Sequence, residues 1–206
     1  IVYSLTVEPT ASFWDCGEFI TTAFKLQVGH PPGAPTFMIL SRFFSLFAGG
    51  DPSLVGYMIN LLSALASGFT IMFLFWTITH IARKIVVKNN EPTTSHIIAV
   101  IGSGLVGALA YAFSDTFWFS AVEAEVYASS SLFTAMVFWA ILKWDEEMAE
   151  IGNGIIPQGY SPDRWLLFIM FMLGLAIGVH LLGILIVPAI AYIIYFRFKD
   201  NITVKG

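Results

Sequence analysis

The chain has 206 residues, of which 57% are hydrophobic and only 12% are charged, and 19 residues are phenylalanine. A soluble domain carries about a quarter charged residues, so this composition excludes an ordinary soluble protein and indicates one embedded in a membrane. The net charge of −4 without a basic stripe predicts no nucleic-acid partner, and the single cysteine, Cys16, excludes an internal disulfide framework.

The first segments predict a truncated span followed by an outer loop. Residues 1–8 are apolar and have the character of the end of a spanning helix. We therefore expect residues 1–206 to be an N-terminal transmembrane domain fragment, with its first span truncated and the C-terminal part of the full protein absent. Residues 9–34 contain polar residues, Gly and Pro, and predict a loop with a short helix. Residues 35–48 are apolar but too short to cross and contain Arg42, which predicts an interfacial helix.

The remaining apolar runs predict the body of a polytopic helical bundle. A turn at 49–52 comes first, and Asp51 or Ser53 can cap the helix that follows it. The expected spanning segments are 54–82, 96–114, 126–142 and the two halves of 165–197, divided near residues 178–182. Between them, residues 115–125 predict a short loop or helix start, and residues 144–164 predict a solvated polar loop.

The basic residues predict how this bundle is oriented. If loop 9–34 lies outside the cytoplasm, all ten Lys and Arg residues except Lys25 and Arg42 fall on the cytoplasmic side, as the positive-inside rule requires. The same topology brings ionisable side chains from three separate segments to the outer surface. They are Asp15, Glu18, His30, Asp115, Glu123, Glu125 and His180. We therefore expect the functional site at the outer surface.

Residues 13–27 (FWDCGEFITTAFKLQ) carry two carboxylates three residues apart. If this segment is helical, Asp15 and Glu18 lie on one face, where paired carboxylates favour a raised pKa and suit general-base work or cation binding. The same spacing fits a capping box, in which Asp15 caps the helix and Glu18 bonds back to it. In the turn GHPPGAP, two prolines hold His30 in a defined direction, either for function or simply within a rigid connector.

Two further features concern acids and a histidine close to hydrocarbon. Glu123 and Glu125 lie at the start of a span, where acids are costly unless they have a cavity or a partner, although acids also suit a helix N-terminus. In a helix, residues i and i+2 point to different sides, so we expect only one of them in the site. His180 lies where the long apolar run turns, either in the site or bonded to a neighbouring carbonyl. Walker, HExxH and CxxC patterns do not occur.

Four segments in this order, TASFWDCGEF, GHPPGAP, AVEAEVYA and GLAIGVHL, resemble a bacterial, Bacteroidetes-type membrane family of domains of unknown function. Its eukaryotic relatives are protein O-mannosyltransferases that act on plexin-type domains. The resemblance covers nearly the whole chain and implies the glycosyltransferase C superfamily, an all-α polytopic bundle with interfacial helices in the first outer loop. It also implies that the first-loop catalytic acid is Asp15, with Glu18 as its neighbour, that His30 is the His-Pro-Pro histidine, and that Glu123 and Glu125 are the second acidic motif.

The resemblance implies a membrane glycosyltransferase that moves a sugar from a polyprenyl-phosphate donor to a hydroxyl of a protein Ser or Thr, or of a glycan. The reaction is expected at the extracytoplasmic face, the periplasmic side of a bacterial inner membrane. Asp15 is the expected general base of an inverting displacement, with Glu18 and His30 in the catalytic site. Lys25, Arg42 and a protonated His180 or His30 are expected to stabilise the leaving phosphate.

Several alternatives stay open on the sequence alone. Trp14 is expected to stack on a sugar face. The outer acids can bind a divalent cation or work without one, so no cofactor is assigned. The alternative functions are a transporter or flippase of a lipid-linked glycan, with the acids as a cation or proton site, and a purely structural scaffold. We expect the 206 residues to be inactive alone, because residues that grip the donor lie later in the chain.

Overall fold

The computed structural model describes residues 1–87, 91–157 and 159–199, and within these ranges every regular element is a helix. The expected all-α bundle is therefore confirmed. Four helical segments of the described chain are long and apolar enough to cross a membrane. They are α4 (Pro52–Val86), α5 (Thr94–Ala112), α7 (Val126–Gly152) and Leu181–Phe198, which consists of η2 (Leu181–Ile186) and α9 (Val187–Phe198).

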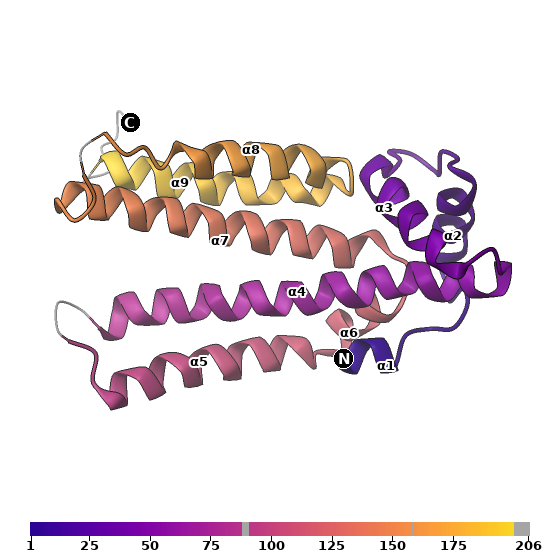
Figure 1. The fold of residues 1–206 in the computed structure, drawn as a ribbon, viewed down its shortest axis with the longest axis horizontal. Helices are drawn as coiled ribbons and strands as arrows, with labels where there is room; N and C mark the ends of the chain where they lie inside the picture. The colour runs from indigo at the N-terminus through magenta and orange to yellow at the C-terminus, as the bar shows by residue number, and fades with distance from the viewer. Residues whose placement is uncertain (88–90, 158, 200–206) are drawn as a thin grey trace.

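The shorter helices are arranged around these segments. Helix α8 (Asp163–Ile177) runs beside α7 and α9, whereas the others gather at one end of the bundle, on the right of Figure 1. Those at the end are α1 (Val2–Leu5), α2 (Cys16–Lys25), α3 (Pro35–Ser45), η1 (Leu46–Ala48) and α6 (Asp115–Val122). The segment expected to form the first outer loop therefore covers one end of the bundle, which we call the loop end.

The stretch α3–η1 is helical and shorter than a membrane span, as expected for residues 35–48. It lies across the loop end of the long helices (Figure 1). Ile39, Phe43, Leu46 and Phe47 each leave more than half of their surface exposed. An apolar face on a short helix at the end of a bundle is typical of a helix that lies in the membrane interface.

The loop expected from residue 144 is wrong in its first part, because α7 continues to Gly152. Asp145 accepts hydrogen bonds from Lys84 Nζ at 2.8 Å and from Arg197 Nε at 2.8 Å. The ion pairs at this end of the bundle, which we call the basic end, include Lys84–Asp145, Arg197–Asp145, Lys143–Glu146 and Arg164–Glu147. Cations from α4, α8, α9 and α7 itself therefore neutralise the acids at residues 145–147, and helix α7 continues through this polar stretch.

The turn after α8 confirms the expected division of the last apolar run. Helix α8 ends at Ile177, and η2 begins at Leu181. The Gly178 carbonyl accepts a hydrogen bond from Thr36 N at 2.8 Å, and a Cβ at residue 178 would overlap the Thr36 hydroxyl. Glycine at this turn therefore allows the start of α3 to pack directly on the end of α8.

The variant Gly178→Ala is expected to lower the free energy of unfolding by about 1–3 kcal/mol, since the added methyl group pushes α3 away from the turn. Gly174→Ala is the matched control, because no atom of the described residues outside the local helix lies within 4 Å of a Cβ there. Thermal unfolding of both variants in detergent checks the comparison. Equal stability of the two variants would contradict the close packing of Thr36 on this turn.

Candidate functional site

Asp15, Glu18 and His30 meet at the loop end, as the sequence predicts. Both ring nitrogens of His30 face carboxylates: Nδ1 lies 3.2 Å from Glu18 Oε2, and Nε2 lies 4.0 Å from Asp15 Oδ2. Glu18 Oε1 also accepts a hydrogen bond from the backbone N–H of His30 at 2.7 Å. The imidazole is therefore held between the two carboxylates.

The capping-box alternative for this pair is wrong. Asp15 stands directly before α2, but its side chain makes no capping hydrogen bond to any described residue. Glu18, which would complete the box, is bonded to His30 instead. The Asp15 carboxylate is consequently available for chemistry.

The local backbone explains how Glu18 reaches the turn that carries His30. A Cβ at Gly29 would lie only 3.1 Å from Glu18 Oε1, so a glycine lets the carboxylate come close to the backbone. The His30 ring packs 5.9 Å from the ring of Phe19, which itself packs edge-on to the buried Phe37 of α3. The apolar contact between α2 and α3 therefore fixes the turn that presents the imidazole.

The pKa of Glu18 is lowered, first by the hydrogen bond from the backbone N–H of His30 and then by the bond to its ring. A carboxylate held in this way stays ionised and anchors the histidine. Because Glu18 is occupied in positioning His30, Asp15, whose side chain is about half exposed, is the better placed of the two to receive a proton.

Glu123 and Glu125 lie in an extended segment between α6 and α7, not in a helix. The expectation that they point to different sides is therefore wrong, because alternate residues of an extended chain share a side. Both line one large cavity, together with Asp15. Glu123 is also held by a hydrogen bond from the Ser12 hydroxyl, and burial raises its pKa.

Glu125 has the most perturbed environment of this group. Its exposed fraction is only 6%. Burial, together with the smaller effect of the negative charges of Glu123 and Asp15, raises the pKa of Glu125 to about 7. A carboxyl group with a pKa near neutrality can both give and take a proton at the pH of most cells, which is typical of a functional acid.

Two cavities meet at Asp15, Glu125 and Tyr127, which line both of them. The smaller cavity has a volume of about 60 Å³, and its wall also includes His30 and His180. The larger has a volume of about 720 Å³, and its wall also includes Trp14, Tyr111, Asp115, Phe119, Glu123 and Ser131. The carboxylates therefore stand where a small group on one side can meet a larger molecule on the other.

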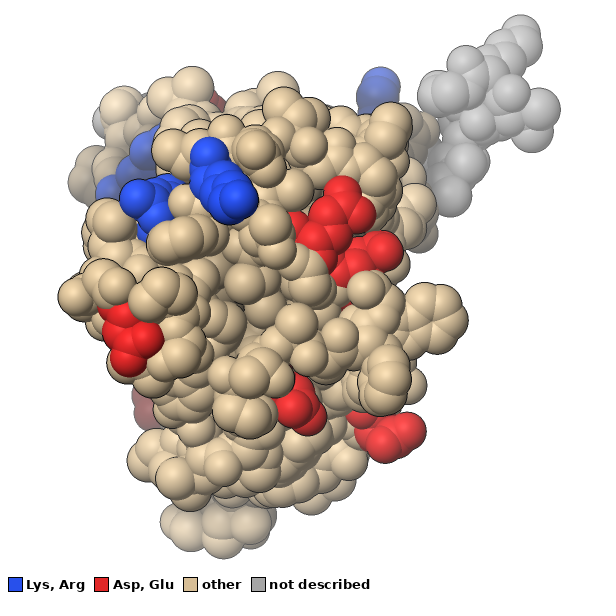
Figure 2. All heavy atoms as spheres, turned by 90° about the vertical axis from the view of Figure 1, so that its right-hand side faces the viewer, with Lys and Arg blue, Asp and Glu red and all other residues tan. Residues whose placement is uncertain are grey.

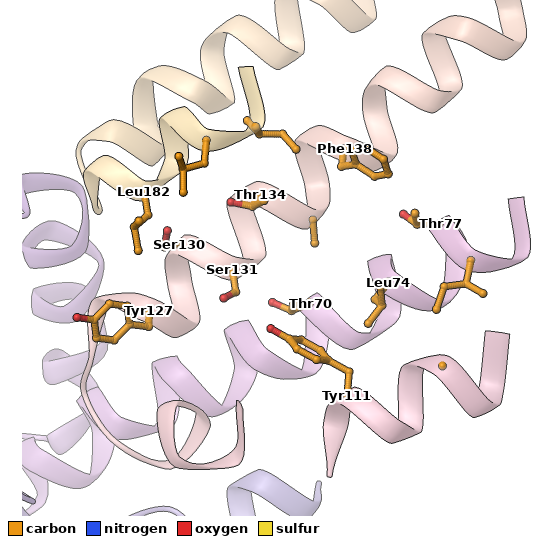
Figure 3. Close-up of a pocket in the computed structure, with 15 residues that line it drawn as sticks. Thr70, Leu74, Thr77, Tyr111, Tyr127, Ser130, Ser131, Thr134, Phe138 and Leu182 are labelled. Atoms are coloured by element: carbon orange, nitrogen blue, oxygen red, sulfur yellow. The ribbon is translucent and has the colours of Figure 1, made fainter. Parts of the chain in front are cut away.

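A third cavity, of about 560 Å³, lies between α4, α5, α7 and η2 (Figure 3). Its walls are mostly apolar, but the hydroxyl-bearing residues Thr70, Ser131 and Tyr111 project into the space between α4 and α7. Tyr111, Tyr127 and Ser131 line both this cavity and the larger one at the loop end. A polar chamber at the loop end thus adjoins an apolar chamber among the long helices.

The two basic residues predicted for this site are not part of it. Lys25 is exposed at the end of α2, and neither it nor Arg42 lines the smaller or the larger cavity. The Arg42 guanidinium lies over the ring of Phe24, 5.3 Å from its centroid, and donates to Ser45 Oγ at 3.2 Å. In Figure 2, which looks onto the loop end, basic side chains gather near one edge and acidic ones lie elsewhere.

His180 and Trp14 do lie at the cavities. His180 Nδ1 accepts a hydrogen bond from Leu182 N at 3.1 Å, so this nitrogen caps η2, and no described carbonyl is its partner. The His180 ring lies 5.5 Å from that of Tyr127, at the smaller cavity. Trp14 lines the larger cavity, and 86% of its surface is exposed, so its ring is available to a ligand.

Asn60 and Ser12 are supporting residues that the sequence reasoning missed. Asn60, fully buried in α4, donates from Nδ2 to the carbonyl oxygens of Glu8 and Thr10 at 2.7 and 2.9 Å. These bonds hold in place the irregular segment 8–12, whose Ser12 hydroxyl donates to Glu123. A lone Asn within an apolar span is a signal for such a role, because a polar side chain there needs a partner.

The variant Asn60→Leu is expected to lower the free energy of unfolding by about 1–3 kcal/mol, because two carbonyl groups lose their donor. Protease cleavage within residues 8–14 is expected to become faster. Ser63→Ala is the control in the same helix, since the buried Ser63 hydroxyl has no partner among the described residues. Thermal unfolding and limited proteolysis in detergent check both variants, and an unchanged cleavage rate in Asn60→Leu would contradict the anchoring role.

These features define a helical integral membrane protein with a carboxylate–histidine site and joined polar and apolar cavities at one end. The chain belongs to the family of the Protein O-mannosyl-transferase TMEM260 N-terminal domain, whose family model matches residues 15–203. The resemblance to the protein O-mannosyltransferases is thereby confirmed.

Two curated relatives carry the corresponding name. The chain is 24% identical over 208 residues to the protein O-mannosyl-transferase tmem260 of Dictyostelium discoideum, covering 98% of this chain and 23% of that protein. It is 30% identical over 149 residues to the protein O-mannosyl-transferase TMEM260 of Mus musculus, covering 72% of this chain and 18% of the relative. The chain therefore spans less than a quarter of the length of either protein. No solved structure is significantly similar to it.

Proposed function

We propose that the protein is a membrane glycosyltransferase of the glycosyltransferase C type, which transfers mannose or a related sugar from a polyprenyl phosphate to a Ser or Thr hydroxyl of a protein. The names of the relatives support the sugar and the protein acceptor. The observation that carries the proposal is the junction of two cavities at Asp15 and Glu125, with a third, apolar cavity beside the larger one.

In this proposal the two carboxylates have different roles because their environments differ. The half-exposed Asp15 carboxylate removes the proton of the acceptor hydroxyl, and the acceptor oxygen then attacks the anomeric carbon. The bond from that carbon to the phosphate oxygen breaks on the opposite side, and the polyprenyl phosphate leaves with the electron pair. One displacement of this kind inverts the anomeric centre. Glu18 keeps His30, and through it Asp15, in position.

Glu125 is assigned to the leaving group. With its pKa near 7, it is partly protonated at neutral pH and gives its proton to the phosphate oxygen as the bond to the anomeric carbon breaks. The hydroxyl groups of Tyr111, Tyr127 and Ser131 line the same chamber and supply further donors. In this proposal Glu125 and these hydroxyl groups stabilise the phosphate. Lys25 and Arg42, which were expected to do so, do not line the chamber.

The joined cavities suit a donor with a polar head and a hydrocarbon chain. The sugar phosphate would occupy the cavity of about 720 Å³, and the first part of the polyprenyl chain the apolar cavity of about 560 Å³. A nucleotide sugar has no hydrocarbon part that would use the second cavity. The chemistry of the walls therefore supports a lipid-linked donor.

The variant Thr134→Phe is expected to raise the KM for the lipid donor roughly tenfold or more, because the larger ring fills the apolar cavity (Figure 3). Val106→Phe is the control, since Val106 is 72% exposed on α5 and lines none of the three cavities. Initial rates at varied donor concentration check the prediction. An unchanged KM in Thr134→Phe would show that the polyprenyl chain does not bind in this cavity.

The proposal includes the orientation of the protein and the use of a cation. The basic end faces the cytoplasm and the loop end faces away from it, which in a bacterium is the periplasmic side of the inner membrane. Asp15, Glu18 and His30 each offer one ligand atom, all within 4.8 Å of one another, a donor set that suits a divalent cation. Such an ion would supply positive charge beside Asp15.

The second candidate is a carrier or flippase of a lipid-linked glycan, which would use the same cavities and a buried acid. Full-length protein in liposomes, given radiolabelled polyprenyl-phosphate mannose, nucleotide-linked mannose and a protein acceptor, separates the two. We expect label on acceptor Ser or Thr residues from the lipid donor only. Movement of the labelled lipid across the bilayer without transfer would favour the carrier, and transfer from the nucleotide sugar alone would reject the lipid donor.

A further inference from the structure

A fourth cavity, of about 410 Å³, lies at the basic end between α4, α5 and α7. It shares no lining residue with the cavities at the loop end, and the proposed sugar transfer does not use it. Its wall includes Trp76, His80, Arg83, Trp139, Lys143 and Glu146. Arg83 lies in the last turn of α4, and Lys143 directly follows the expected span 126–142. Basic residues at such positions, with tryptophans nearby, are typical of the level of lipid headgroups.

Cations predominate in the wall of this cavity. Glu146 is the one acid of its wall, and its carboxylate is held by Lys143 and lies 3.8 Å from His80 Nδ1. Arg83 is exposed and takes part in no ion pair within residues 1–87, 91–157 and 159–199. The neighbouring Lys84 and Asp145 pair with each other at 2.8 Å, so they add little net charge. Arg83 is thus available to an anion.

One ring nitrogen of the histidine in this wall lacks a partner among the described residues. Only 11% of the His80 side chain is exposed, and its Nε2 has no hydrogen-bond partner in the described part of the chain. A buried ring nitrogen without a partner is uncommon, because leaving it unpaired is costly. A phosphate oxygen in the cavity would accept a hydrogen bond from this nitrogen.

The apolar part of the wall indicates what else the ligand carries. Trp76 and Trp139 lie one to two turns deeper in α4 and α7 than Arg83 and Lys143, and their rings are 5.6 Å apart. A ligand that contacts both the basic residues and the deeper tryptophans has an anionic head and a hydrocarbon part. We propose that this cavity binds an anionic phospholipid, with its phosphate at Arg83 and His80 and the start of an acyl chain against the two tryptophans.

The proposal is tested on the full-length protein in nanodiscs made from equimolar phosphatidylglycerol and phosphatidylcholine. Native mass spectrometry after detergent release counts the lipids retained. We expect retained phosphatidylglycerol in preference to phosphatidylcholine, and a roughly fivefold weaker retention in Arg83→Gln, the loss expected from one basic residue. Arg164→Gln, which removes the same charge from an exposed position at the same end, is expected to retain the lipid.

Four outcomes decide the proposal. Equal retention of the two lipids would overturn it, and so would an equal loss in Arg164→Gln, which would indicate a diffuse charge effect. If inorganic phosphate alone displaced phosphatidylglycerol, the cavity would be a site for a free anion, and the proposed lipid binding would be wrong. Quenching of tryptophan fluorescence by tail-brominated phosphatidylglycerol, weakened in a folded Arg83→Gln, supports it. Because Arg83 is exposed, this variant is expected to unfold at the wild-type temperature, and Arg83→Lys is expected to recover most of the binding.

Discussion

Replacing Asp15 by Asn is expected to lower the rate of sugar transfer by roughly 10²–10⁴-fold, because the acceptor hydroxyl loses the base that takes its proton. The substitution keeps the size of the side chain and its proximity to His30 Nε2, so binding of the lipid donor is expected to change little. The measurement is kcat and KM for the full-length protein with a polyprenyl-phosphate sugar. The loss should fall on kcat.

Asp163→Asn is the matched control for this variant. Asp163 lies in the first turn of α8, toward the basic end of the bundle, so the same change of charge and atoms occurs far from the cavities. The control is expected to retain wild-type kcat. If Asp15→Asn were fully active, the assignment of Asp15 as the base would be wrong, whereas the cavities and their lipid donor would still have to be tested separately.

Glu125→Gln is expected to have two opposite effects, on activity and on stability. Transfer should fall roughly 10²-fold, because an amide cannot give a proton to the leaving phosphate. In the wild type, kcat is expected to fall as the pH rises through about 7, where Glu125 loses its proton, and this dependence should be absent from the variant. The pH profile of kcat is the measurement, and an identical profile in the two proteins would reject the role.

The stability effect follows from the same pKa. The folded-state pKa of Glu125 is about 7 and the ordinary value is 4.5, so the folded protein holds this proton to higher pH than the unfolded chain does. Ionisation of Glu125 therefore lowers the free energy of unfolding as the pH rises from about 4.5 to 7. Above pH 7, Glu125→Gln should be more stable than the wild type by up to about 3 kcal/mol.

Unfolding at several pH values in detergent checks this linkage. The two proteins should converge in stability as the pH falls below about 4.5, where the carboxyl is protonated in both states. Glu8→Gln is the control, because Glu8 is exposed at the same end of the chain and lines neither the smaller nor the larger cavity. A variant of Glu125 that is less stable than the wild type above pH 7 would show that the carboxylate is stabilised by partners.

Hydropathy predicted most of the fold, because a membrane leaves few ways to bury an apolar run. The turn between α8 and η2 was predicted from length alone. The helical course of residues 144–152 was not predictable locally, since it depends on cations that α4 and α9 bring to Asp145. Such partners are 52 and 61 residues away in the chain.

The site was predicted in part, for similar reasons. Residue type and spacing identified Asp15, Glu18 and His30, but the spacing fitted a capping box equally well, and only the path of the chain brings His30 back to Glu18. The direction of the Arg42 side chain was not predictable, because it depends on Phe24, which the sequence does not place. Glu123 and Glu125 share a cavity because their segment is extended rather than helical.

The anomeric configuration of the product tests the central claim most directly. Full-length protein is incubated with a polyprenyl-phosphate mannose of known configuration and a protein acceptor, and the linkage formed on Ser or Thr is determined by NMR. A single displacement with Asp15 as base predicts a product whose configuration is opposite to that of the donor. A product with the donor's configuration, or no product at all, would contradict the account.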